Sequence, residues 1–169
     1  MFEVLVFVYE NYWRGDACPE WDSLERKLST VGFDEDEIQE ALSWLAELKT
    51  ATLGAEWSQR PASQRGATLL PDPTLRQPSP LSMRVYSVKE QSHLGSECLG
   101  YISFLEQIGV LPIPMREIVL DRALATPCTP LSLDDLKIIV LMVYWSFGEE
   151  PDALLLDELC DNTAARVGH

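Results

Sequence analysis

The chain has 169 residues, of which 46% are hydrophobic, so it is long enough for one ordinary domain or for two small helical lobes. Its 13 Lys and Arg residues face 27 Asp and Glu residues, and the formal net charge of -14 opposes binding to phosphate backbones or anionic membranes and favours basic partners. The longest apolar run, residues 138–145, falls well short of the ~20 residues that span a bilayer, so we expect a cytoplasmic protein without a membrane segment.

Two helices are predicted before residue 33. Residues 2–13 alternate valines as a strand would, but the length of the segment suits a buried helix, which we favour. Glu3 stands where a signal peptide would carry basic residues, so we do not expect a signal peptide. Residues 24–31 place apolar side chains at helical spacing, and Gly32 can supply the positive φ that commonly ends a helix.

The clearest helix is predicted to begin at Asp34. Asp34 and Glu37 have the spacing of a capping box, and early carboxylates complement the positive end of the helix dipole. The apolar stripe that follows at helical intervals consists of Ile38, Ala41, Leu42, Leu45 and Leu48. We therefore predict a helix over residues 34–49.

Residues 53–80 differ from both flanks, because prolines alternate there with Ser, Gln, Gly and Thr, and aliphatic side chains are few. We predict a flexible linker over this range. It divides the chain into an N-terminal helical lobe over residues 1–52 and a C-terminal helical bundle over residues 81–169.

The bundle is predicted to begin with a short extended segment near Val85. Ser87 and Glu90 have capping-box spacing and open a short helix. A longer helix follows, and Gly109 can end it. The buried face that we expect for this longer helix consists of Leu94, Cys98, Tyr101, Ile102, Leu105 and Ile108.

Three more helices complete the expected bundle. Pro112 and Pro114 lie where the first of them begins. Ser132 and Asp135 start the second, which is apolar on nearly every side, as helices at the centre of a core usually are. Pro151 opens the last helix.

These elements predict an all-α fold, a helical bundle of about seven helices in two lobes joined by the Pro-rich linker. Two alternatives stay open. The lobes could pack together as one domain, and the segment near Val85 could form one short β segment.

A series of uncommon strings runs through both halves of the chain: Met1-Phe2-Glu3-Val4-Leu5, Gly32-Phe33 with Ala41-Leu42-x-Trp44-Leu45, Leu81-Ser82-Met83-Arg84-Val85-Tyr86, Phe104-Leu105-Glu106-Gln107-Ile108-Gly109-Val110-Leu111, Arg116-Glu117-Ile118-Val119 with Asp121-Arg122, and Leu133-Asp134-Asp135-Leu136-Lys137 with Val140-Leu141-Met142-Val143. Together they resemble the Smg family of bacterial proteins, whose function is unknown. The resemblance covers most of residues 1–52 and 81–148, and the Pro-rich stretch looks longer than in the family. It implies a bacterial cytosolic protein and supplies no activity and no site residues.

The two helices on either side of Gly32 resemble a helix-turn-helix, which raises the hypothesis of a nucleic-acid-associated module. The charges oppose it, because the second helix begins with acidic residues: Asp34, Glu35, Asp36 and Glu37. A DNA-recognition helix needs hydrogen-bond donors and basic side chains at this position. The same carboxylates suit an acidic regulator that occupies the phosphate-binding surface of a basic protein. We favour a simpler interpretation, a solvated acidic face that keeps the protein soluble.

No motif for catalysis, a cofactor or a metal is found in the sequence. The four cysteines form no C-x-x-C pair and the chain has two histidines, so clustered zinc ligands are missing. His93 lies in a polar segment, and we expect it at the surface. We expect Asp134 and Asp135 to cap a helix instead of acting as acid and base. A non-enzymatic protein without a cofactor is therefore expected.

Arg84 and Arg122 are the basic residues of most interest. Arg122 falls on the same helical arc as the apolar Met115 and Val119, where a buried charge requires a carboxylate partner. We predict structural ion pairs for these arginines. A guanidinium that binds a ligand anion is the alternative.

Trp21 and Trp57 lie in segments too polar to bury them fully, and exposed aromatic side chains can anchor an interface. The candidate interaction residues are thus Trp21, Trp57, Asp34, Glu35, Asp36, Glu37, Arg84 and Arg122. They predict an interaction or adaptor protein whose partner is a protein with a basic surface, without direct nucleic-acid binding. The alternative is a nucleic-acid-associated module or an acidic regulator of a nucleic-acid-binding protein, and the oligomeric state stays open.

Overall fold

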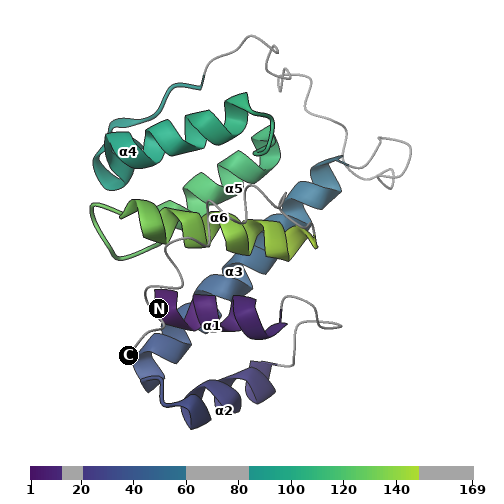
Figure 1. Ribbon diagram of the computed structural model, residues 1–169. Coiled ribbons are helices and arrows are strands. Elements are labelled where there is room, and N and C mark those ends of the chain that lie inside the picture. Colours follow the sequence, from purple (N-terminus) through teal and green to yellow (C-terminus); the bar gives the residue numbers. More distant parts are fainter. Residues whose placement is uncertain (13–20, 60–83, 149–169) are drawn as a thin grey trace.

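The computed structural model describes residues 1–12, 21–59 and 84–148, and at 55–59 it describes the backbone alone. These residues form six α-helices (Figure 1): α1 Phe2–Tyr12, α2 Trp21–Val31, α3 Glu35–Gln59, α4 Val88–Gln107, α5 Ile113–Leu124 and α6 Leu133–Phe147. No strand occurs in the described ranges, and Val85 lies outside any helix. The all-α prediction is confirmed with six helices instead of about seven; the helix expected from Pro151 lies outside the described residues.

The core is organised around α6. Its side chains are buried without interruption from Leu136 to Tyr144, and it contacts α1, α3, α4 and α5. Figure 1 shows α6 between α1 on one side and α4 with α5 on the other. A helix that meets neighbours on every side needs apolar residues on every side, so the prediction of a central helix is confirmed.

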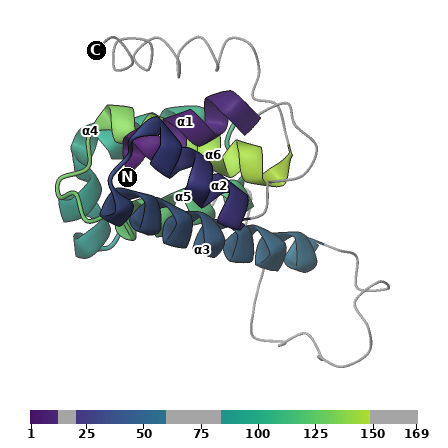
Figure 2. The ribbon, with the colours of Figure 1, turned by 90° about the horizontal axis from the view of Figure 1, so that it is seen from below.

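The helices before the predicted linker and those after it share one core. The first helix, α1, packs against α3 and α6, and α3 also packs against α5. Figure 2 shows α3 lying along one side of the other helices. A buried hydrogen bond joins α3 to α5, since Nε1 of Trp44 donates to the carbonyl oxygen of Arg122 at 3.1 Å. The two parts are therefore packed together as one unit.

The third helix is longer than the sequence predicts. The linker is expected from residue 53, but α3 continues to Gln59. Thr52 is buried, and its hydroxyl forms a hydrogen bond with the hydroxyl of Ser146 in α6 at 2.8 Å. The first proline of the Pro-rich segment is Pro61, so every residue of α3 has the backbone N–H that a helix requires. The helix therefore runs past the change in composition.

Several predicted caps and turns are present. Gly32 follows α2 with φ 107°, and Gly109 follows α4 with φ 76°. Ser87 and Glu90 form a complete capping box at the start of α4. Gly95 interrupts α4 with φ 71° and ψ 173°, a conformation that glycine adopts readily. A short helix followed by a longer one is thus confirmed.

Candidate interaction surfaces

Asp134 and Asp135 lie in the capped first turn of α6. The hydroxyl of Ser132 accepts a hydrogen bond from the backbone N–H of Asp135 at 3.1 Å and donates one to Oδ2 of the same residue at 2.6 Å. Within the described residues, no group of three or more His, Cys, Asp or Glu side chains could hold a metal ion.

His93 is buried, so its expected surface position is wrong. Its Nε2 lies 3.0 Å from the carbonyl oxygen of Ala123, and its Nδ1 lies 3.0 Å from Oγ1 of Thr129. Because a carbonyl oxygen can only accept, we assign the hydrogen to Nε2, and Nδ1 accepts from the Thr129 hydroxyl. The ring thus joins α4 to the end of α5 and to the loop before α6. These partners are distant in sequence, so the polar neighbours of His93 gave a misleading signal.

Cys98 is buried beside the same loop. Burial raises the pKa of its thiol to about 11, and the negative charges of Glu97 and Asp135 act in the same direction. The thiol donates a hydrogen bond to the carbonyl oxygen of Leu131 at 3.4 Å. A protonated, buried thiol is a poor nucleophile, so Cys98 has a packing role.

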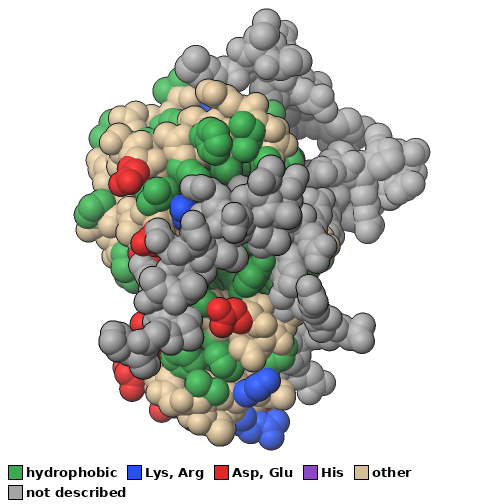
Figure 3. Space-filling view, viewed as in Figure 1, with side chains coloured by type: hydrophobic (Ala, Val, Ile, Leu, Met, Phe, Trp, Pro, Cys, Tyr) green, Lys and Arg blue, Asp and Glu red, His purple; other side chains and the backbone are tan. Residues whose placement is uncertain are grey.

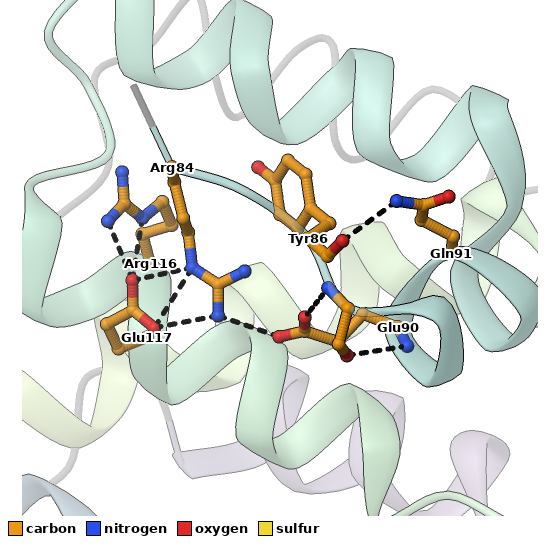
Figure 4. A network of polar contacts seen from close by, with 7 residues as sticks. Arg84, Tyr86, Glu90, Gln91, Arg116 and Glu117 are labelled. Atoms are coloured by element: carbon orange, nitrogen blue, oxygen red, sulfur yellow. Dashed lines mark hydrogen bonds and ion pairs between the residues drawn. The ribbon is translucent and has the colours of Figure 1, made fainter. Parts of the chain in front are cut away.

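Arg84 joins the segment before α4 to α5 (Figure 4). Its Nη2 donates to Glu90 at 2.7 Å and to Glu117 at 3.0 Å, and its Nε donates to Glu117 at 3.0 Å. The hydrogen bond from Arg84 lowers the pKa of Glu90 to about 2, although burial opposes this shift. The predicted ion pair is confirmed. The carboxylates engage Nε and Nη2, whereas the buried Nη1 has no hydrogen-bond partner among the described residues.

Arg116 extends this network, although the sequence does not single it out. It forms ion pairs with Glu106 of α4 and, at 2.7 Å, with Glu117 of its own helix. Burial alone would raise the pKa of Glu117, but hydrogen bonds from Arg84 and Arg116 lower it. The Arg116 side chain is 9% exposed, whereas those of Glu106 and Glu117 are 35% and 46% exposed. The cation is covered and its carboxylates face solvent.

Arg122 shows the same asymmetry. It pairs with Glu47 of α3 at 2.5 Å and with Asp121 at 2.8 Å, and its side chain is 9% exposed against 56% and 63% for the carboxylates. Burial lowers the pKa of Arg122, but the hydrogen bonds that its guanidinium donates to the two carboxylates outweigh this effect, and the pKa is raised. The predicted structural ion pair is confirmed. Its partner Glu47 lies far away in sequence, and no local pattern identifies it.

The carboxylates at the start of α3 present their charge differently. Asp34, Glu35 and Asp36 are exposed. Glu37 is partly exposed, and its Oε1 lies 3.2 Å from the amino group of Met1, which ties α3 to α1. Helices α2 and α3 pack against each other on either side of Gly32, which agrees both with a helix-turn-helix and with an ordinary helical hairpin. Its second helix begins with exposed acidic side chains.

The two candidate tryptophans do not join this acidic surface. Trp21 begins α2 and packs partly buried against the core, whereas Asp34 follows the other end of that helix. A helix of 11 residues is roughly 16 Å long, so the two sites are well separated. Trp57 lies in α3 and not in the linker, and its side chain lies outside the described part of the structure. Their role at an interface stays a prediction.

Exposed apolar side chains lie on both sides of the turn between α4 and α5. Phe104, Ile108 and Ile113 are each about half exposed, and we call these three residues the α4–α5 corner. Figure 3 shows hydrophobic side chains grouped over α4. The expected burial of Ile108 is wrong, because α4 ends at Gln107 and the chain turns away there. Sequence periodicity extends the apolar stripe one residue beyond the helix.

None of the helices within the described ranges is long and apolar enough to cross a membrane.

The comparisons with known proteins agree with the resemblance seen in the sequence. The model of a family described as "Protein of unknown function (DUF494)" matches residues 1–169. Proteins named "Protein Smg homolog" from Methylibium petroleiphilum and Leptothrix cholodnii are each 52% identical over 169 residues, and one from Bordetella pertussis is 42% identical over 170. All three alignments cover the whole of both chains. No solved structure matches. The chain therefore belongs to the DUF494 family, whose function is unknown and to which the Smg homologs are related.

Proposed function

We propose that this protein is a non-enzymatic interaction protein that uses its acidic surface to bind a protein partner with a basic surface. The observation that carries the proposal is the placement of charge. The guanidinium groups of Arg116 and Arg122 are covered, while the carboxylates that pair with them face solvent. In these two clusters the cations are covered and the anions are displayed, which makes the potential outside them negative.

The start of α3 offers three consecutive exposed carboxylates that form no ion pair within the described residues. They are those of Asp34, Glu35 and Asp36. Charges that are already solvated and unpaired gain Coulomb energy with an incoming cation without first breaking an internal pair. This surface therefore suits a partner rich in Lys or Arg, and it steers that partner during association.

The second hypothesis is a nucleic-acid-associated module, with which the packing of α2 against α3 is compatible. It predicts binding to DNA or RNA that weakens steeply with salt. The exposed carboxylates at the start of α3 oppose it, because the N-terminal end of a recognition helix contacts bases and phosphates. A protein partner with a basic surface fits the same geometry without this conflict.

The test is recovery of partners from a lysate of the source cells, with and without nuclease, by the tagged full chain and two variants. The first variant neutralises the start of α3 by Asp34→Asn, Glu35→Gln and Asp36→Asn. The second, a matched control, removes the same charge from other exposed positions by Glu3→Gln, Glu10→Gln and Asp22→Asn.

We expect a stoichiometric basic protein that survives nuclease, is recovered by the wild type and by the control, and is lost with the α3 variant. Recovery of nucleic acid alone, or of proteins that nuclease removes, would contradict the proposal and favour the module. Equal loss with both variants would show that net charge acts and that the start of α3 has no special role.

A further inference from the structure

We infer that the α4–α5 corner is a docking surface for a basic protein segment that carries two or three large apolar side chains. This inference goes beyond the proposed function, because the corner is a separate surface. Figure 1 places the start of α3 and the turn between α4 and α5 at opposite ends of the molecule. Phe104 lies in the last turn of α4, Ile108 directly follows that helix, and Ile113 begins α5 on the other side of the turn.

The corner is held in place from beneath. The N–H groups of Val110 and Leu111 donate to the carbonyl oxygen of Leu105 at 3.0 and 3.1 Å, and Leu111 is buried. The hydroxyl of Tyr144 in α6 donates to the carbonyl oxygen of Val110. The turn is therefore fastened to the central helix, and exposure of the corner is not a consequence of a loose end. A preorganised apolar surface binds with a smaller entropic cost.

The rim of the corner determines which partner fits. Glu117 lies one helical turn beyond Ile113 on α5, and its carboxylate reaches solvent while the guanidinium of Arg116, with which it pairs, is covered. Glu106 of α4 pairs with the same guanidinium and is also partly exposed. An apolar surface with carboxylates beside it complements a segment that has apolar anchors and Lys or Arg next to them. Apolar anchors supply most of the affinity in such contacts, and the charges supply selectivity.

The same charges argue against other occupants. A second copy of this chain would bring another net charge of -14 to the contact, which repels. Nucleic acids and anionic membranes meet the same repulsion. A cationic protein segment is the occupant that gains from both the apolar surface and its rim.

The test uses the full chain with isoleucine δ1 methyl groups labelled for NMR. The probe is a short amphipathic helix made of Leu and Lys, and its analogue with Gln in place of Lys is the charge control. We expect the Lys peptide to shift or broaden the signals of Ile108 and Ile113 and to leave the buried Ile139 unchanged. The Gln analogue should bind at least about tenfold more weakly, a difference of about 1.4 kcal/mol.

Two double variants locate the binding. Phe104→Ala with Ile108→Ala removes half-exposed anchors, whereas Val85→Ala with Val88→Ala removes apolar side chains that are more exposed and lie near the other end of α4. We expect about a tenfold loss of affinity for the first pair and less than about twofold for the second. The α3 variant described above should bind the peptide as the wild type does, which separates failure of this inference from failure of the proposed function.

Three outcomes would overturn the inference. The first is equal affinity of both double variants or of both peptides. The second is a concentration-dependent dimer of the wild type that Phe104→Ala with Ile108→Ala abolishes, which would make a second copy the occupant. The third is protection of the Ile108 and Ile113 methyl groups from a soluble paramagnetic agent in the free protein, which would show that the chain itself covers the corner.

Discussion

The carboxylates at the start of α3 and those between α4 and α5 differ in what they contact. Glu106 and Glu117 flank Arg116, and the ion pair between Glu106 and Arg116 joins α4 to α5. Asp34 and Glu35 face solvent, and no cation of the described residues pairs with them. The first set contributes to packing as well as to the potential around the molecule, whereas the second contributes to the potential alone.

Stability and binding are therefore expected to depend on different carboxylates of this protein. A change in the ion pairs of α4 and α5 should alter the free energy of unfolding. A change at the start of α3 should alter recognition of a partner and leave the fold almost unaffected.

The largest expected effect is acid destabilisation through Glu90. Its folded pKa of about 2 lies below its ordinary value of 4.5, so its contribution is fully present above pH 4.5 and is lost as the pH falls towards 2. This contribution is at most roughly 3.5 kcal/mol, since one pKa unit corresponds to about 1.4 kcal/mol. Urea unfolding of the wild type and Glu90→Gln across this range measures it. The variant should lose less stability than the wild type, and an unchanged pH profile would contradict the role of the pair.

The next effect is the loss of the bridge between α3 and α5. Arg122→Ala should lower the free energy of unfolding by about 2 kcal/mol, because packing of the side chain and two ion pairs are lost while Glu47 and Asp121 regain water. Arg26→Ala, at an exposed position of α2, is the control and should change it by less than about 0.5 kcal/mol. Equal effects of the two substitutions would show that the covered guanidinium has no structural role.

The smallest effect on stability is expected at the start of α3. The variant with Asp34→Asn, Glu35→Gln and Asp36→Asn loses favourable interactions with the helix dipole and also loses mutual repulsion, so the net change should stay within about 1 kcal/mol. Thermal unfolding followed by circular dichroism measures this change. A much larger loss would mean that these carboxylates hold the fold together, and the distinction between the two regions would fail.

Local signals in the sequence predict much of the fold. Gly32 and Gly109 end helices, and Ser87 with Glu90 begins one, because each of these effects depends on a few consecutive residues. The central position of α6 follows from its apolar character on every side. These features need no knowledge of distant contacts.

The features that the sequence does not predict depend on such contacts. His93 is buried because Ala123 and Thr129 supply partners for its ring, and both lie about thirty residues away. Ile108 is exposed because the chain turns where the helical period would continue. The identity of the carboxylate partners also follows from the packing of helices, so chemistry alone predicts that Arg122 needs one without indicating which.

The proposal that the start of α3 binds a basic protein is tested most directly by recovery of the partner from nuclease-treated lysate. The amount recovered by the α3 variant is compared with the amount recovered by its matched control. Both variants lose three negative charges, so their comparison removes the effect of net charge. We predict that the control, with Glu3→Gln, Glu10→Gln and Asp22→Asn, recovers a basic protein as the wild type does and that the α3 variant does not. Equal recovery by the two variants would contradict the claim that the start of α3 is the binding surface.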